Sequence, residues 1–343
     1  MSEVWLNSPH GTARFDPSCG RVSFLRHAIF RTNTLHTAPW VHEPPLAHLA
    51  PVEQRLAGDF FCAPFGTSDQ APIHGWSANS AWAWEPKNEG LRARLLRPVQ
   101  GAQITKDLAF TQGPAFVQTH TIQGGDGSLP IAHHPMVHAQ GQTWLSFSPK
   151  SHAVTLPEPL EPGCNWLATG QHCGLGDLRT EKGEAASLEA YPNAEAVEDF
   201  VILVEAAEDG LGWTAVIREE LDDMILILKN CATLPNTMLW ISNGGRTEPP
   251  WSGRHRRVLG IEDGFPPSAL SHLVPEGRQA LSLGNTIKTH HAILRLPRPR
   301  GWTHVARITC QERGLNVYSR DQTRAKSDRT RNLRRCRVVT TYI

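Results

Sequence analysis

The stretch DFVILVEAAEDGLGWTAVIREELDDMILILKNCATLPNTMLWISN (residues 199–243) holds four short apolar runs that follow one another at short intervals. The runs cover residues 199–206, 212–219, 223–230 and 236–243. Runs of this length, rich in Val, Ile and Trp and bounded by Gly, Asp, Asn and Pro, are typical of β-strands. We therefore predict consecutive strands that short turns join, as in an antiparallel sheet.

Strand patterns continue on both sides of this stretch. They cover residues 21–35, 114–138, 142–149 and 303–310, and the second of these indicates two extended runs around a Gly-Gly-Asp-Gly turn. Helical signals are few: residues 266–273 predict a short helix with Pro in its first turn, and residues 192–199 are a further candidate. The predicted fold class is all-β, a mainly antiparallel β-sandwich with few short helices.

Composition excludes several classes of protein. The 343 residues are 40% hydrophobic and 20% charged, with a net charge of +1, which is typical of a globular protein and gives no general reason to expect a nucleic-acid or membrane partner. Seven scattered cysteines without a CxxC pair predict reduced thiols rather than a zinc ribbon. No apolar run approaches the roughly 20 residues of a membrane helix, and the N-terminus resembles no signal peptide, so we expect a cytoplasmic protein.

The C-terminal part of the chain differs from the rest. Residues 318–343 carry eight Lys or Arg and two acidic residues, and their apolar residues come late. Such a composition predicts a basic tail without fixed structure, following a domain at residues 1–317. The last run, RVVTTYI (337–343), is the exception, because its β-branched residues could form a closing strand.

Segment 58–84 combines a Cys-X-Pro-Phe-Gly sequence, a His-Gly pair at His74 and three tryptophans, one of which is Trp76. Proline and glycine break regular structure, and Trp offers a flat apolar face with a single donor. This mixture fits the wall of a pocket as well as it fits a core strand. His74 is accordingly either a pocket residue or a hydrogen-bonded loop histidine.

A second histidine cluster lies in IAHHPMVH (131–138). His134 and His138 flank a proline in an extended run, where residues four apart share a face but lie about 13 Å from each other. The cluster alone therefore does not predict a metal site, and we expect no metal.

VLGIEDGF (258–265) places Glu262 at the end of a short apolar run. Burial there would raise the pKa of the carboxyl toward the range of a general base. The alternative is an exposed acid at the end of a strand.

Residues 239–264 concentrate polar and aromatic side chains. Asn243 and Arg246 supply directional donors, and Trp240 and Trp251 supply flat faces that stack on a pyranose ring. This set of groups suits a polyhydroxylated ligand, and it equally suits a polar loop whose tryptophans pack on the core.

Three motifs, in this order, resemble the aldose 1-epimerase (galactose mutarotase-like) superfamily. The first is Gly-X-X-X-Cys-X-Pro-Phe-Gly at 58–66 with the following His-Gly, which resembles the hexose-6-phosphate epimerase branch. The second, His-Pro-Met-Val at 134–137, resembles the family's His-Pro-Tyr-Phe strand. The third, Leu-Gly-Ile-Glu at 259–262, resembles its Leu-Gly-hydrophobic-Glu strand. Order and rough spacing match from about residue 20 to residue 310.

The resemblance implies a β-supersandwich whose site lies on a concave sheet surface and binds a small-molecule sugar. It implies that Glu262 is the general base that takes the proton from the anomeric hydroxyl, and that His134 protonates the ring oxygen. His74 would hold the sugar and help to polarise the ring oxygen. This chemistry requires one base and one acid and no cofactor.

The sequence also departs from the family. The branch that acts on phosphorylated sugars has an arginine soon after the His-Gly pair, whereas this chain continues Trp-Ser-Ala-Asn from Trp76, so we expect an unphosphorylated sugar. Two hypotheses follow: an isomerase that interconverts the anomers of an aldose, and a sugar-binding paralogue without turnover.

Overall fold

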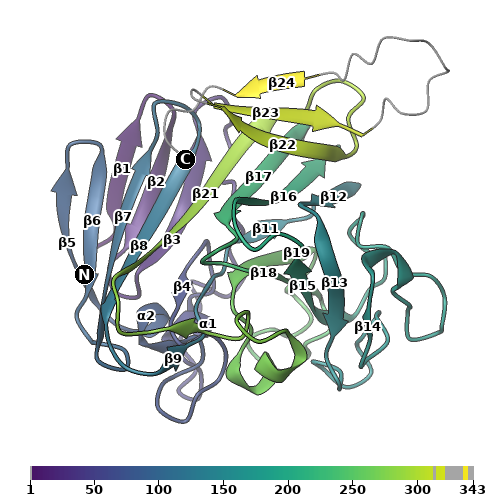
Figure 1. Cartoon of the computed structure of the whole chain (residues 1–343), viewed down its shortest axis with the longest axis horizontal. Coiled ribbons are helices and arrows are strands. Elements are labelled where there is room, and N and C mark those ends of the chain that lie inside the picture. The colour runs from purple at the N-terminus through teal and green to yellow at the C-terminus, as the bar shows by residue number, and fades with distance from the viewer. Residues whose placement is uncertain (1, 312–313, 321–334, 339–343) are drawn as a thin grey trace.

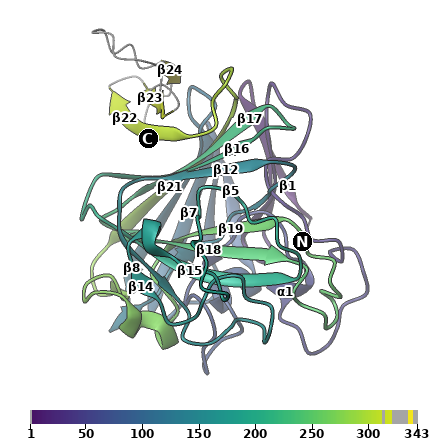
Figure 2. The same ribbon diagram turned by 90° about the vertical axis from the view of Figure 1, so that its right-hand side faces the viewer.

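The computed structural model describes residues 2–311, 314–320 and 335–338, the last of these through the backbone alone. Two eight-stranded sheets form the body of the protein, and every pair of strands within them is antiparallel (Figures 1 and 2). The predicted all-β sandwich is therefore confirmed.

The sheet that carries the candidate site, here called the site sheet, contains the first and the last of the four strands of the quoted stretch. Its strands, in spatial order, are β14 (His172–Cys173), β13 (Lys150–Thr155), β15 (Val197–Glu205), β18 (Asn236–Asn243), β19 (Val258–Gly264), β10 (Ala132–His133) and β4 (Phe61–Cys62), and β11 (Met136–His138) also pairs with β19.

The second sheet, here called the back sheet, covers one face of the site sheet. Its strands are β12 (Thr143–Phe147), β16 (Leu211–Arg218), β17 (Asp223–Asn230), β21 (Ile287–Pro297), β8 (Phe116–Gly124), β7 (Ala102–Phe110), β6 (Gly90–Leu95) and β5 (Trp82–Lys87).

Smaller elements complete the described structure. They are a three-stranded sheet of β1 (Val4–Ser8), β2 (Gly11–Asp16) and β3 (Arg21–His27), the pair β9 (Ser128–Leu129) and β20 (Leu281–Ser282), a sheet of β22 (Val305–Gln311), β23 (Gly314–Ser319) and β24 (Arg335–Val338), the short helices α1 (Pro51–Gln54) and α2 (Gly75–Asn79), and the 3₁₀ helices η1 (Leu175–Asp177) and η2 (Ser268–Leu273). No described helix is long and apolar enough to cross a membrane.

The central strands are buried on both faces, which is why their sequences read as continuous apolar runs. In β18, Leu239 and Ile241 pack into the core between the two sheets, whereas Met238 and Trp240 belong to a second apolar cluster on the opposite face. Loops and short helices from residues 38–78 cover that second cluster. The face of the site sheet that points away from the back sheet is thus also enclosed.

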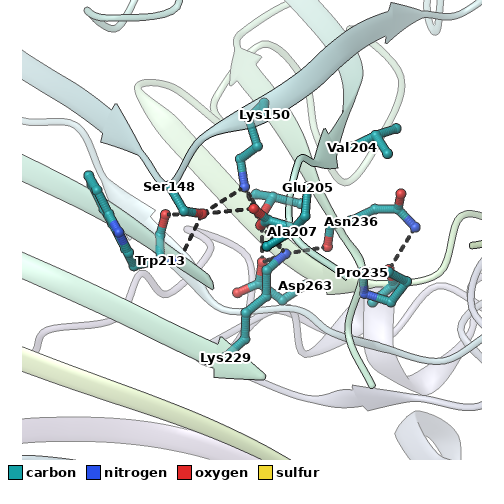
Figure 3. A network of polar contacts seen from close by, with 12 residues as sticks. Ser148, Lys150, Val204, Glu205, Ala207, Trp213, Lys229, Pro235, Asn236 and Asp263 are labelled. Atoms are coloured by element: carbon teal, nitrogen blue, oxygen red, sulfur yellow. Dashed lines mark hydrogen bonds and ion pairs between the residues drawn. The ribbon is translucent and has the colours of Figure 1, made fainter. Parts of the chain in front are cut away.

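A buried polar network joins the two sheets (Figure 3). Lys229 of β17 places its Nζ 2.9 Å from both Asp263 Oδ1 and Glu205 Oε1 on the site sheet. Lys150 contacts the same Glu205 carboxylate, and Thr237 donates to Asp263 over 2.8 Å. Two ammonium groups thus face two carboxylates, which neutralises charges that would otherwise be costly to bury.

Most of the predicted strands are present, and two of them have the predicted bounds, 223–230 and 236–243. The segment 114–138 is divided further than expected, into β8, β9, β10 and β11. The predicted helix at 266–273 is the 3₁₀ helix η2. The helix considered for 192–199 is absent, because its last residues already form the start of β15.

The predicted tail needs correction at two places. Tyr318 and Ser319 belong to β23 rather than to a tail. Residues 335–338 pair with β23 as β24, so a strand does form there, and it includes the first two residues of the segment 337–343 that was considered for it. The other tail residues, 321–334 and 339–343, lie outside the described residues.

Candidate active site

A cavity of about 170 Å³ lies against the face of the site sheet that points away from the back sheet. The lining residues come from both the sheet and the covering loops. They are Val52, Glu53, Leu56, Phe65, Gly66, Ile73, His74, His134, Leu156, Leu160, Phe200, Trp240, Arg246, Trp251, Glu262, Pro267 and Leu270. The three residues to which the resemblance assigns catalytic roles, His74, His134 and Glu262, therefore meet at one cavity.

Glu262 and His134 contact each other directly. His134 Nε2 lies 3.0 Å from Glu262 Oε1, and both side chains are almost fully buried. Burial raises the pKa of Glu262 well above its usual value and, together with the nearby His74, lowers the pKa of His134 well below its usual value. Both shifts favour the uncharged forms, so the pair holds a single proton, with the carboxyl O–H donating to Nε2.

The position of the Glu262 carboxyl depends on a neighbouring glycine of β19. Gly260 lies two positions earlier on the same face of β19, and a Cβ there would lie 2.9 Å from Glu262 Oε1 and 3.1 Å from Trp240 Cβ. A glycine at this position therefore leaves the space that the Glu262 carboxyl occupies.

His134 lies between β10 and β11, where Asp59 and Phe60 contact its backbone and its ring. Its backbone N–H lies 3.0 Å from both Asp59 Oδ1 and the Phe60 carbonyl oxygen. Its ring stacks on the Phe60 ring, with centroids 4.4 Å apart. These contacts fix both the backbone and the ring plane of His134.

His74 reaches the cavity through an unusual backbone conformation. It has φ of 64° and immediately precedes α2, and the next residue, Gly75, also has a positive φ. A Cβ at Gly75 would lie 2.0 Å from the Ala63 carbonyl oxygen, so this position requires glycine. The His74 ring stacks on Phe65 and lies 5.1 Å from the His134 ring. Burial and the charge of Arg246 lower the pKa of His74 to about 3, so His74 is neutral and can serve as a hydrogen-bond partner.

Arg246 brings one positive charge to the cavity wall. Its guanidinium group lies 4.6 Å from the ring centroid of Trp251 and 5.6 Å from that of Trp240, within the range of cation–π attraction. Its Nε lies 3.0 Å from Glu161 Oε1. Trp240 in turn donates through Nε1 to Glu198 over 3.0 Å.

Two predicted sugar-binding residues lie elsewhere. The Asn243 amide donates to the Ala194 carbonyl oxygen over 2.6 Å and accepts from the Arg257 N–H, so it ties two loops together. The guanidinium carbon of Arg97 lies over the Trp76 ring, 3.6 Å from the ring centroid. Neither residue lines the cavity.

Sequence reasoning missed most of the cavity wall. The apolar lining residues come from loops that are far apart in the chain, and no periodic pattern marks them. Leu156 and Leu160 lie in a proline-rich connection, and Leu270 lies in η2.

One cluster of buried groups has the composition of a metal site. The ligand atoms of Asp59, His133 and His291 lie within 4.8 Å of one another, on the core side of the site sheet. The two imidazole rings, however, are stacked with planes 12° apart and centroids 4.1 Å apart. Imidazole lone pairs lie in the ring plane, so two stacked rings do not direct them at one ion. Asp59 already accepts from Gln118 and from the His134 N–H. The cluster therefore does not fit a metal ion bound by all three groups.

Comparisons with known proteins agree with this architecture. No protein-family model and no curated protein sequence matches the chain. Among solved structures, it is similar to a galactose mutarotase-like protein from Lactobacillus casei, with a TM-score of 0.57, 12% identity, and coverage of 86% of this chain and 100% of that chain. It is also similar to a galactose mutarotase related enzyme from Lactobacillus acidophilus, with a TM-score of 0.56, 10% identity, and coverage of 87% and 99%.

A third similar structure is an aldose epimerase homologue from C. elegans, with a TM-score of 0.56, 12% identity, and coverage of 87% of this chain and 100% of that chain. At these identities the likeness concerns the fold, because one fold supports many functions. It confirms the resemblance at that level: this chain has the galactose mutarotase-like fold.

Proposed function

We propose that the protein is an isomerase of the aldose 1-epimerase type, which interconverts the anomers of a cyclic hemiacetal sugar. The contact of 3.0 Å between Glu262 and His134 at the wall of the cavity carries this proposal. A carboxyl and an imidazole that share one proton supply one acid and one base, which is what ring opening of a hemiacetal requires.

The steps balance with this pair alone. The Glu262 carboxyl proton first passes to His134 Nε2 across their contact. The carboxylate then accepts the proton of the anomeric hydroxyl, while the imidazolium gives its proton to the ring oxygen. The bond from C1 to the ring oxygen breaks, the aldehyde forms, and the pair ends as carboxylic acid and neutral imidazole. Burial favours this uncharged form of the pair. Rotation about C1–C2 and the reverse transfers then close the other anomer.

Replacement of Glu262 tests the proposal. Polarimetry or NMR of freshly dissolved aldoses should show faster anomer exchange with the protein, and Glu262→Gln should lower the rate about 10²–10⁴-fold. His134→Gln should have a similar effect. The matched control is Glu85→Gln, an exposed residue of β5, which should keep full activity.

The second candidate function is sugar binding without turnover. The same contact favours it in one respect, because Glu262 and His134 satisfy each other and an occupant must separate them. A protein that binds a sugar and exchanges no anomer, with unchanged affinity in Glu262→Gln, would support this candidate and contradict the isomerase.

A further inference from the structure

We propose that the cavity accepts a cyclic hemiacetal with an apolar body, such as a multiply deoxygenated sugar, rather than a polyhydroxylated hexose. The proposal rests on the proposed function for the hemiacetal end of the ligand. The composition of the cavity wall, which is independent of turnover, carries the rest.

The wall is mostly apolar. Eleven of its seventeen residues have apolar or tryptophan side chains, and they surround the cavity from several segments. Ile73, Leu160, Phe200 and Leu270 are partly exposed and pack against the apolar cluster beneath them, so they present hydrocarbon to an occupant. Each methylene or methyl group buried against such a surface strengthens binding about fourfold.

Polar partners for sugar hydroxyls are few among the described residues. Glu262 and His134 face each other, and the Glu53 carboxylate accepts from the Ala50 N–H at the start of α1. Arg246 forms an ion pair with Glu161. Three buried atoms of lining residues have no hydrogen-bond partner in the described structure: His74 Nδ1, His134 Nδ1 and Arg246 Nε.

A hexose would therefore bring more hydroxyl groups than this wall can satisfy. A buried hydroxyl without a partner loses its hydrogen bonds to water, which weakens binding roughly tenfold for each group. Asn243 and Trp76, the residues that could have widened the polar surface, have their own partners outside the cavity. The wall thus selects a ligand that confines its polar atoms to the hemiacetal edge, near Glu262, His134 and His74.

The test compares two probes on the full chain. The first is 2-hydroxytetrahydropyran, a cyclic hemiacetal without other hydroxyl groups, and the second is glucose. Anomer exchange followed by NMR should give a KM at least tenfold lower for 2-hydroxytetrahydropyran, with dideoxy and 6-deoxy hexoses between the two. An equal or lower KM for glucose would overturn the inference and leave the proposed function intact.

Binding separates the two proposals further. Tetrahydropyran-2-methanol has no hemiacetal and cannot exchange, and its binding is measurable through the fluorescence of Trp240 and Trp251, which line the cavity. If it and 2-hydroxytetrahydropyran bind but the protein accelerates no exchange, the proposed function is wrong and the apolar ligand stands. If neither binds more tightly than glucose, the apolar ligand is wrong.

A change in the wall should shift the preference. Leu160→Asn adds a hydrogen-bonding group to the cavity, and we expect it to raise the KM for 2-hydroxytetrahydropyran and lower that for glucose. The matched control is Leu96→Asn, since Leu96 is 52% exposed and lies outside the cavity. An unchanged ratio of the two KM values in Leu160→Asn would contradict the role of the wall.

Discussion

Strand β19 carries two neighbouring carboxyl groups that point to opposite faces of the site sheet. Glu262 faces the cavity and Asp263 faces the core between the sheets, and both are buried. Among the described residues, Glu262 has one basic side chain within ion-pair distance, that of His134. Asp263 contacts Lys229 (Figure 3) and also His291.

The pKa values of these two neighbours shift in opposite directions. Burial raises the pKa of Glu262. Burial also acts to raise the pKa of Asp263, but the charge of Lys229 and the hydrogen bond from His291 outweigh it, so this pKa lies far below its usual value. The pairing partner, rather than the degree of burial, decides whether a buried acid is charged.

The histidines repeat the contrast. His134 faces the cavity and contacts Glu262, whereas His133 packs in the core and stacks on His291. His133 ends β10 and His134 follows it, and successive residues of an extended chain point to opposite sides. One residue therefore separates the candidate catalytic pair from the structural network. The cavity face holds a pair that can exchange a proton, and the core face holds ions that stabilise the packing of the sheets.

The largest expected effect comes from removing the central cation of the core face. Lys229→Met leaves the Asp263 and Glu205 carboxylates without their shared partner and removes the donor to the Asn236 carbonyl oxygen. Loss of one member of a buried ionic network costs about 3–5 kcal/mol of unfolding free energy. Chemical denaturation should show this loss, and Lys288→Met, at an exposed position of β21, should change little. A loss under about 1 kcal/mol would contradict a stabilising role for the network.

The second prediction compares how Asp263 and Glu262, the two neighbouring acids of β19, affect the free energy of unfolding at different pH. The lowered pKa of Asp263 means that its contribution to stability is present above its unfolded pKa of about 3.9 and is lost as the pH falls below it. Asp263→Asn should therefore lower the unfolding free energy at pH 7, by about 1–3 kcal/mol. The raised pKa of Glu262 has the opposite sign, because stability is lost as the pH rises above its unfolded value of about 4.3.

Glu262→Gln should accordingly be at least as stable as the wild type, and its advantage should grow from pH 5 to pH 8. Denaturation of both variants at several pH values checks this. Equal losses in the two variants would show that burial, and not pairing, governs both sites.

The sequence predicts the central strands well and the edges less well. β17 and β18 have the predicted bounds because both faces are covered, their central residues are apolar and polar residues mark their ends. The segment that forms β5, β6 and β7 was not predicted, although β6 and β7 alternate buried and more exposed residues, because charged side chains interrupt its apolar pattern. The strand β24 pairs through a segment whose composition is that of a tail.

The residues of the candidate site were also predicted only in part. Family resemblance, rather than periodicity, singled out Glu262, His134 and His74, and the fold brings them together. The assignment of Asn243 to sugar binding depended on residue type. Residue type does not reveal that the Asn243 amide donates to the Ala194 carbonyl oxygen instead of lining the cavity. The apolar wall could not be predicted, since which loop residues meet depends on the tertiary arrangement.

The third prediction concerns the pH dependence of anomer exchange. The active pair holds one proton, and the opposite shifts of Glu262 and His134 widen the range in which it does so. The rate should therefore be flat across neutral pH. On the acid side the pair gains a second proton, and the rate should fall only below the ordinary histidine pKa of about 6.5. On the alkaline side the pair loses its proton, and the rate should fall only well above the ordinary glutamate pKa of about 4.3. Both limits belong to the pair rather than to one residue. A narrow optimum between these ordinary values would contradict the shared proton.

The smallest effect is expected where an ion pair has good geometry but remains in solvent. Arg92 of β6 binds Asp107 of β7 through two hydrogen bonds of 2.8 and 2.7 Å, and the two side chains are 46% and 34% exposed. Water competes for both groups and salt screens them, so Arg92→Met should cost less than about 1 kcal/mol.

This cost should shrink further at 1 M NaCl, where the screening length is about 3 Å. Denaturation of Arg92→Met and Lys229→Met at low and high salt compares the same kind of deletion at an exposed and a buried site. The buried site should keep most of its loss at high salt, because its ions have no solvent around them. A loss in Arg92→Met as large as that in Lys229→Met would mean that geometry, rather than exclusion of water, gives the core network its strength.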